Sequence, residues 1–151
     1  MATRKLKDSD YRALAEFRYR IRCFLRFSEQ AARAAGIEPQ QHQLLLSIKG
    51  LPMEKKPTVG VLAERMQLAH HSMVELIDRS EHRGLVARRR DKEDRRQVLV
   101  EITPAGEEIL AELSLYHFDE LGSVGPALAQ VLSTFVEKTG PSARLRIVGK
   151  R

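Results

Sequence analysis

The segment from residue 58 to residue 103 constrains the fold most, because two helical patterns are followed by an alternating one. Apolar residues recur at helical spacing over Val59–Met66 and again over Met73–Ser80. Gly84 then supplies a residue type that commonly ends a helix. Beyond an arginine-rich run, apolar and polar residues alternate over Val98–Ile102. Two helices followed by a β-hairpin predict a winged helix-turn-helix, which binds duplex DNA.

The second of these helices carries polar side chains on the face opposite its apolar stripe. Histidine and serine can exchange hydrogen bonds with bases, glutamate can accept from cytosine, and arginine can bind phosphate or guanine. The open alternative is that one or two of these residues, Ser72 above all, only cap the helix. The residues of this helix predicted to contact DNA are His70, His71, Ser72, Glu75 and Arg79.

The hairpin that follows is rich in cationic side chains. We expect its first strand to begin at Leu85 and its tip to run from Arg88 to Arg96. Guanidinium groups suit the narrow minor groove, where negative potential is concentrated, and we expect a carboxylate to hold Arg96 by a bidentate contact. The alternative is a solvated hairpin with local ion pairs. The wing residues assigned to the DNA-binding site are Arg88, Arg90, Lys92, Asp94, Arg95 and Arg96.

Further helices are predicted on both sides of this segment. The first ends at Gly36, the second begins at Pro39, and a later one begins at Thr103 and Pro104. Glycines and a proline at residues 122–126 predict a break, after which a last apolar stripe follows. The expected architecture is therefore mainly α, with about six helices and a two-stranded β wing.

The terminal helices suggest a dimer, because a small winged helix does not need them to complete its core. We expect residues 1–37 and 104–138 to form a helical dimerisation region around a DNA-binding region at 38–103, in one structural domain. A flexible basic tail is expected at 139–151. Two-fold symmetry would place two reading heads about 34–36 Å apart, which predicts a palindromic site in double-stranded DNA.

The composition agrees with a polyanionic partner. The chain has 26 Lys and Arg against 20 Asp and Glu, a net charge of +6, and an isoelectric point near 9.8. No apolar run approaches the roughly 20 residues that span a bilayer, and the first residues resemble no secretory signal. With a single cysteine no disulfide can form within the chain, which suits a reducing cytoplasm. We expect a cytoplasmic protein without a membrane partner.

Several stretches in the right order resemble the MarR family of transcriptional regulators, over roughly residues 10–138. The clearest is 94–106, where Asp94 and Arg96 are followed by alternating aliphatic residues, a threonine and a glycine; residues 39–45 and 64–86 also match. The resemblance implies a homodimeric DNA-binding repressor or activator with six helices and a wing, and no catalysis. It implies that Asp94 orients the wing and that Arg96 enters the minor groove.

The same resemblance implies a small, often aromatic or anionic effector that binds between the dimerisation helices and the reading head. The predicted polar groups of that site are Arg22, which would pair with a carboxylate or phenolate, and His42, which would donate a hydrogen bond. Phe17 and Ile21 would form its apolar wall. The open alternative is that Arg22 is a surface charge and His42 a packing residue.

Other chemistry finds little support in the sequence. No phosphate-binding loop, nucleophile elbow or paired His-Glu motif is present, so no catalytic residue and no cofactor are expected. Cys23 is interpreted as a small packing residue at a helix interface, with redox sensing as the alternative. One further alternative is a zinc-responsive regulator that uses His42, His117 and a carboxylate. Another is a winged helix that binds proteins but not DNA. No metal site is expected.

Overall fold

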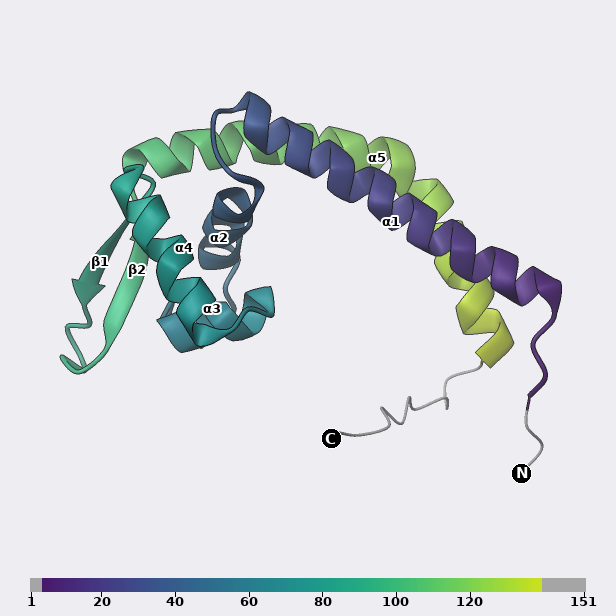
Figure 1. The fold of residues 1–151 in the computed structure, drawn as a ribbon, viewed down its shortest axis with the longest axis horizontal. Helices are drawn as coiled ribbons and strands as arrows, with labels where there is room; N and C mark the ends of the chain where they lie inside the picture. The colour runs from purple at the N-terminus through teal and green to yellow at the C-terminus, as the bar shows by residue number, and fades with distance from the viewer. Residues whose placement is uncertain (1–3, 140–151) are drawn as a thin grey trace. The chain divides into compact units, whose positions relative to one another are not determined.

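The structure is a computed structural model that describes residues 4–139. These residues form five helices and one two-stranded sheet (Figure 1), which confirms the predicted mainly α fold with a β wing. Nearly all of the predicted tail at 139–151 lies outside the described residues. The elements are α1 (Asp8–Ala34), α2 (Pro39–Lys49), α3 (Val59–Met66), α4 (His70–His82), β1 (Val86–Arg90), β2 (Val98–Ile102) and α5 (Pro104–Thr139).

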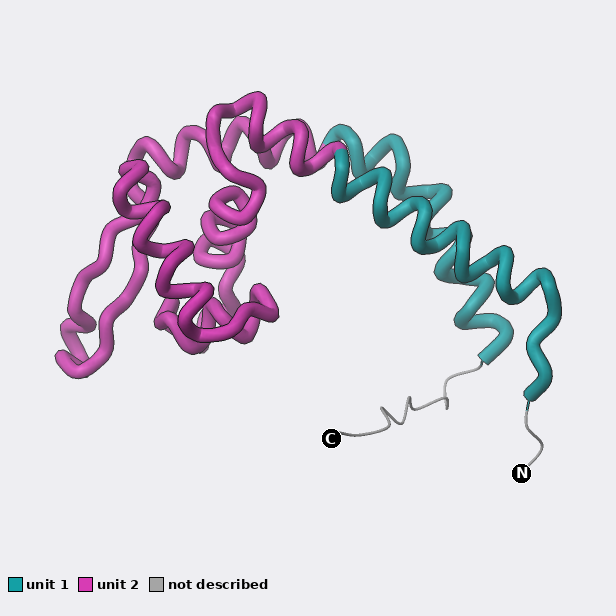
Figure 2. The backbone as a smooth tube through the Cα atoms, viewed as in Figure 1, with its two compact units in different colours: residues 1–26, 119–151 teal, residues 27–118 magenta. Residues whose placement is uncertain are grey.

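Two compact units divide the described residues (Figure 2). Unit 1 combines residues 4–26 with 119–139, and unit 2, the winged helix unit, is 27–118. The long helices α1 and α5 each contribute to both units. The proposed dimerisation role of the terminal regions stays a prediction.

The helix ends of the winged helix unit fall where the sequence predicts them. Thr58 caps α3, its hydroxyl accepting a hydrogen bond from the amide of Val61 at 3.3 Å. Gly84 follows α4 with φ +76°, a left-handed conformation that favours glycine. Thr103 caps α5, because its hydroxyl accepts from the amide of Gly106 at 3.1 Å and donates to the carbonyl of Gly84 at 2.6 Å.

One hydrophobic core fills the winged helix unit. It draws on every helix and both strands of the unit, so α4, the predicted recognition helix, and the wing are packed on the same core. Burying a Val, Leu, Ile or Met side chain fully stabilises the fold by about 1.5–3 kcal/mol relative to leaving it exposed. Its members include Leu44, Leu45, Leu62, Met73, Leu76, Ile77, Leu85, Val86, Val100, Leu110 and Leu113.

The wing is an antiparallel hairpin whose register runs from Val86 opposite Ile102 to Arg90 opposite Val98. Its loop therefore covers residues 91–97, and the expectation that the tip begins at Arg88 is wrong. The first three arginines of the run, 88–90, are in strand β1 because they pair with the alternating residues of β2. The amide of Val100 also donates to the carbonyl of Pro57 at 2.9 Å, which ties the α2–α3 connector to the wing.

The expected break at residues 122–126 is also wrong, because α5 runs without interruption through Pro126. A proline inside a helix removes one backbone hydrogen bond and crowds the preceding turn. Contacts that α5 makes beyond Pro126 offset this cost within unit 1. The rings of Phe17 and Phe135 meet edge to face with centroids 5.9 Å apart, and Lys138 pairs with Asp10 at 2.7 Å. Tertiary packing thus overrides the local signal.

Unit 1 also exposes large apolar side chains on both of its helical segments. On α1 these include Tyr11, Leu14, Tyr19 and Leu25, and on α5 they include Leu121, Leu132 and Val136. Among residues 4–139 no helix is both long and apolar enough to cross a membrane.

Candidate nucleic-acid interface

Helix α4 presents the predicted reading face to solvent. Its buried side consists of Met73, Leu76, Ile77 and Ser80. The opposite side exposes His70, His71, Glu75 and Arg79, while Ser72 is half-buried. The helix begins after Ala69, and no side chain caps its first turn. Ser72 therefore does not act as the cap, and the first amides remain available to an anion such as a phosphate.

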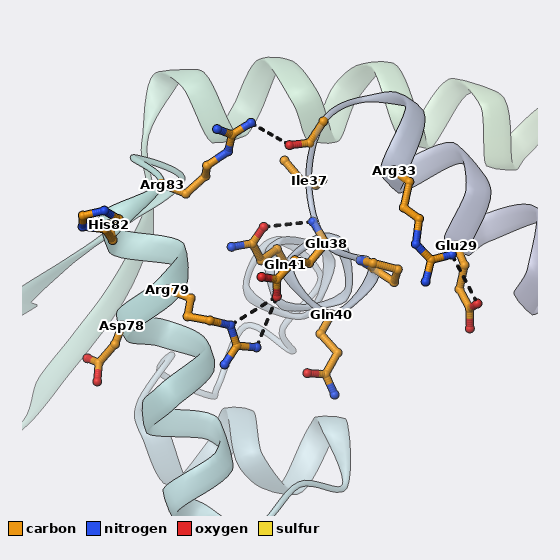
Figure 3. A pocket seen from close by; sticks show the side chains of 12 residues that line it. Glu29, Arg33, Ile37, Glu38, Gln40, Gln41, Asp78, Arg79, His82 and Arg83 are labelled. Carbon is orange, nitrogen blue, oxygen red and sulfur yellow. Dashed lines mark hydrogen bonds and ion pairs between the residues drawn. The ribbon is translucent and has the colours of Figure 1, made fainter.

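Arg79 is engaged within the protein. Its guanidinium contacts one carboxylate oxygen of Glu38 through Nε and Nη2, each at 3.2 Å, beside the start of α2 (Figure 3). Nearby, Nη2 of Arg83 donates to the carbonyl of Gly36 at 2.6 Å. These contacts border an open groove whose lining also includes Arg33 and His82. Arg79 can meet DNA only by sharing or leaving its contact with Glu38.

Arg88 links the wing to the recognition helix. Its Nη2 contacts Asp78 at 2.6 Å and its Nη1 contacts Glu81 at 3.0 Å, while the other Glu81 oxygen accepts from the Arg88 amide at 3.0 Å. The side chain is only 26% exposed. Arg88 was predicted as a DNA contact; its place in the structure is between two carboxylates of α4.

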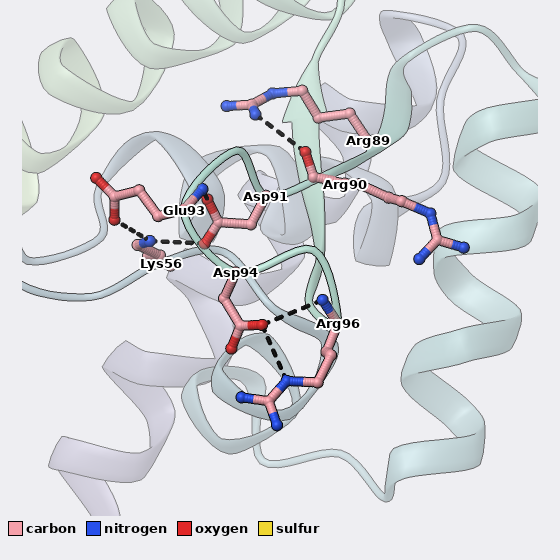
Figure 4. A network of polar contacts seen from close by, with 7 residues as sticks. All are labelled: Lys56, Arg89, Arg90, Asp91, Glu93, Asp94 and Arg96. Atoms are coloured by element: carbon pink, nitrogen blue, oxygen red, sulfur yellow. Dashed lines mark hydrogen bonds and ion pairs between the residues drawn. The ribbon is translucent and has the colours of Figure 1, made fainter.

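The loop of the wing holds exposed cations. The side chain of Arg96 is 92% exposed, and one carboxylate oxygen of Asp94 accepts from its Nε at 3.2 Å and from its amide at 3.1 Å (Figure 4). A carboxylate thus holds Arg96 as expected, but through a single oxygen and not by a bidentate pair. Arg90 donates to the carbonyl of Arg95 at 3.0 Å. Lys92 and Arg95 are exposed.

Sequence reasoning missed the residue that anchors this loop. Lys56, in the α2–α3 connector, places Nζ 2.6 Å from Oδ2 of Asp91 and 2.7 Å from Oε2 of Glu93 (Figure 4). The contact with Asp91 contributes most to lowering the pKa of that carboxyl, and both contacts raise the pKa of the Lys56 ammonium. The only signal in the sequence was a lysine-containing connector, and nothing local identified its partners 35 and 37 residues away.

The predicted effector residues are divided between the two units. Arg22, Phe17 and Ile21 belong to unit 1, where Arg22 is exposed and Phe17 packs on Phe135. His42 belongs to unit 2 and is 2% exposed. Its ring lies 4.8 Å from that of His117, centroid to centroid. Burial, and then the charge of His117, lower the pKa of His42 to about 4. An effector site built from these residues stays a prediction.

The residues of the redox and metal alternatives, Cys23 and His117, lie in different surroundings. Cys23 is exposed, so within the single chain it is not the packing residue that the sequence predicts. A hydrogen bond with Cys23 raises the pKa of the Tyr19 hydroxyl. His117 contacts Ser28 through Nε2 at 2.8 Å and the carbonyl of Leu113 through Nδ1 at 2.6 Å. Across the described part of the chain, no group of three or more His, Cys, Asp or Glu side chains is placed to hold a metal ion.

Comparison with known proteins points to one family. The sequence model of the MarR family matches residues 35–97. The chain is 41% identical over 56 residues to YsmB of Bacillus subtilis, an uncharacterized HTH-type transcriptional regulator; the match spans 37% of this chain and 38% of the relative. The structure resembles that of AbsC, a MarR family regulator from Streptomyces coelicolor, with a TM-score of 0.71 and 19% identity over 92% of this chain and 95% of that one.

Two further solved structures share the fold and carry ligands. CouR from Rhodococcus jostii, bound to p-coumaroyl-CoA, gives a TM-score of 0.61 with 21% identity over 82% of this chain and 88% of CouR. A MepR F27L mutant from S. aureus, bound to an oligodeoxyribonucleotide, gives a TM-score of 0.61 with 16% identity over 89% of this chain and 99% of MepR.

Proposed function

Because the chain belongs to the MarR family of winged helix-turn-helix transcriptional regulators, we propose that it is a homodimeric cytoplasmic repressor of specific genes. It reads a palindromic site in duplex DNA, and a small aromatic or anionic effector releases it. The family consists of regulators and not of enzymes, so the proposal contains no catalytic step.

The observation that carries the proposal is the shared base of helix α4 and the wing. Both are packed on one core, and both expose groups suited to DNA. In this account α4 enters the major groove, where His70, His71, Ser72 and Glu75 face the base edges. The free amides of its first turn approach a phosphate. The fold neighbour MepR, solved with an oligodeoxyribonucleotide, supports DNA binding by this fold.

In the proposed complex the wing meets the minor groove. Arg96 is its leading side chain, because it is almost fully exposed and Asp94 accepts hydrogen bonds from its amide and its Nε. Lys92, Arg90 and Arg95 add positive charge beside the phosphates. Arg79 and Arg88 already have carboxylate partners, so we assign them a smaller share of the contact than the sequence alone predicts.

The dimer and the effector rest on separate observations. Exposed apolar side chains on both helical segments of unit 1 support an interface between two copies of the chain. The effector class is supported by CouR, a fold neighbour solved with p-coumaroyl-CoA, whose ligand is both aromatic and anionic. Arg22, His42, Phe17 and Ile21 remain the proposed effector residues.

Titrations of labelled duplex DNA test the proposal. A dimer that makes about 6–10 phosphate contacts should lose roughly 10³–10⁵ in affinity between 50 and 200 mM salt. A titration that does not depend on salt would exclude the basic surface as the contact.

Aromatic carboxylates and aromatic acyl-CoA thioesters are then added to the complex of DNA with wild type, Arg22→Ala and His42→Gln. Release from wild type alone supports the proposed effector residues. Equal release from all three proteins excludes those residues but keeps the effector, and no release excludes this effector class.

A further inference from the structure

We propose that Lys56 is a positioning residue for DNA binding, which fixes the loop of the wing from the α2–α3 connector without itself contacting DNA. The inference rests on the proposed function, because it concerns how the wing is prepared for the minor groove. It assigns a role to a lysine outside both the recognition helix and the wing.

Lys56 joins the loop at its first and third residues. Its Nζ contacts Asp91 at 2.6 Å and Glu93 at 2.7 Å. The Asp91 side chain is only 6% exposed, whereas that of Glu93 is 82% exposed. The contact with Asp91 is therefore the better shielded of the two and screened least by salt. The opposite pKa shifts of Lys56 and Asp91 agree with a mutual ion pair.

Asp91, which Lys56 holds, forms hydrogen bonds with the backbone of the loop. Its Oδ1 accepts a hydrogen bond from the amide of Glu93 at 3.0 Å, and its own amide donates to the carbonyl of Gln97 at 2.9 Å. The carbonyl of Asp94 in turn accepts from the amide of Gln97 at 2.9 Å. Lys56, which lies outside the wing, is thus linked through Asp91 to the backbone hydrogen bonds that shape the loop.

The loop held in this way carries Lys92, Arg95 and Arg96, the proposed DNA contacts. Ordering a flexible loop during binding would cost affinity, whereas a loop already fixed in its bound geometry avoids that cost. Lys56 itself is a poor candidate for a phosphate contact. Two of its three N–H donors meet carboxylates, whose charges offset its own.

Two substitutions with opposite charge effects test the assignment. Lys56→Met removes a positive charge, and Asp91→Asn removes a negative one while keeping the oxygen that accepts from Glu93. If Lys56 positions the loop, both changes weaken DNA binding, by about threefold to tenfold each, and combining them adds little further. Lys56→Arg, which can reach both carboxylates, should restore most of the affinity.

Salt dependence separates positioning from direct contact. The slope of log affinity against log salt falls by about 0.9 for each phosphate contact removed. Lys56→Met should keep the wild-type slope, whereas Arg96→Ala should reduce it. Lys55→Met is the matched control, because it removes the same charge from the neighbouring, exposed residue of the connector; it should bind nearly as wild type does.

The outcomes can be told apart. A reduced slope in Lys56→Met, with Asp91→Asn binding as tightly as wild type or more tightly, would make Lys56 a DNA contact and overturn the inference. Failure of the wild-type protein to bind DNA would reject the proposed function instead. Thermal melting checks that each variant is folded; if Lys56→Met is not, Asp91→Asn and Lys56→Arg decide the question.

Discussion

The rings of buried His42 and half-buried His117 are tilted against each other in the winged helix unit, with centroids 4.8 Å apart and planes inclined by 48°. Burial, and then the charge of His117, lower the pKa of His42 from 6.5 to about 4. The unfolded chain therefore binds more protons than the folded one between these two values. The free energy of unfolding should fall as the pH drops from 6.5 toward 4, by up to about 1.4 kcal/mol per pH unit from this residue.

Thermal melting across this pH range measures the effect. His42→Gln removes the titrating group and should flatten the dependence, while His82→Gln, at an exposed position on α4, should leave it unchanged. Identical pH profiles for wild type and His42→Gln would show that His42 does not make this contribution.

Arg96→Ala should weaken binding to the preferred DNA site and leave the melting temperature nearly unchanged. The side chain is 92% exposed, and substitutions at such positions usually change stability by less than about 0.5 kcal/mol. The control is Arg12→Ala, an exposed arginine of α1 in unit 1. Equal affinities for the two variants and wild type would remove the wing from the contact surface.

Gly106→Ala should destabilise the fold by at least about 2 kcal/mol, because a Cβ at this position would lie 2.3 Å from the carbonyl oxygen of Leu85. Gly60→Ala is the matched control. Nothing lies within 4 Å of its added Cβ, and alanine is the better helix former, so this change should be neutral or stabilising by up to about 1 kcal/mol. Denaturant unfolding of both variants provides the comparison. Similar stabilities would contradict the close packing of the α5 start against the Leu85 backbone.

A stable homodimer should be present at micromolar concentration, with twice the chain mass of 17.2 kDa. The driving force is burial of the exposed apolar residues of unit 1, such as Leu14 and Leu132. Light scattering measures the mass directly. Leu14→Glu together with Leu132→Glu should shift the population toward monomer, and a wild-type monomer would refute the proposed assembly.

Local signals explain why much of the fold was predictable. Thr58, Gly84 and Thr103 mark helix ends through hydrogen bonds and conformations that depend on nearby residues. Pro126 misled the prediction because its cost is offset by contacts with residues more than 100 positions away, such as that of Phe135 with Phe17. Periodicity cannot reveal such compensation.

The candidate site was also predictable only where local sequence signals determine it. Exposure of the α4 face follows from helical spacing, so its polar residues were found from the sequence. The pairing of Arg88 with Asp78 and Glu81, and that of Lys56 with Asp91, depends on how the hairpin lies against its neighbours. A cationic residue in an arginine-rich segment cannot be classed as a DNA contact or an internal support from its identity alone.

Selection of bound duplexes from a random DNA pool tests the central proposal most directly, with the whole chain used as bait. The proposed mode of binding predicts enrichment of a palindrome whose half-sites are about one helical turn, 10–10.5 base pairs, apart from centre to centre. The same selection with Arg96→Ala should yield the palindrome more weakly. A wild-type pool that remains random after repeated rounds would contradict sequence-specific DNA recognition by this protein.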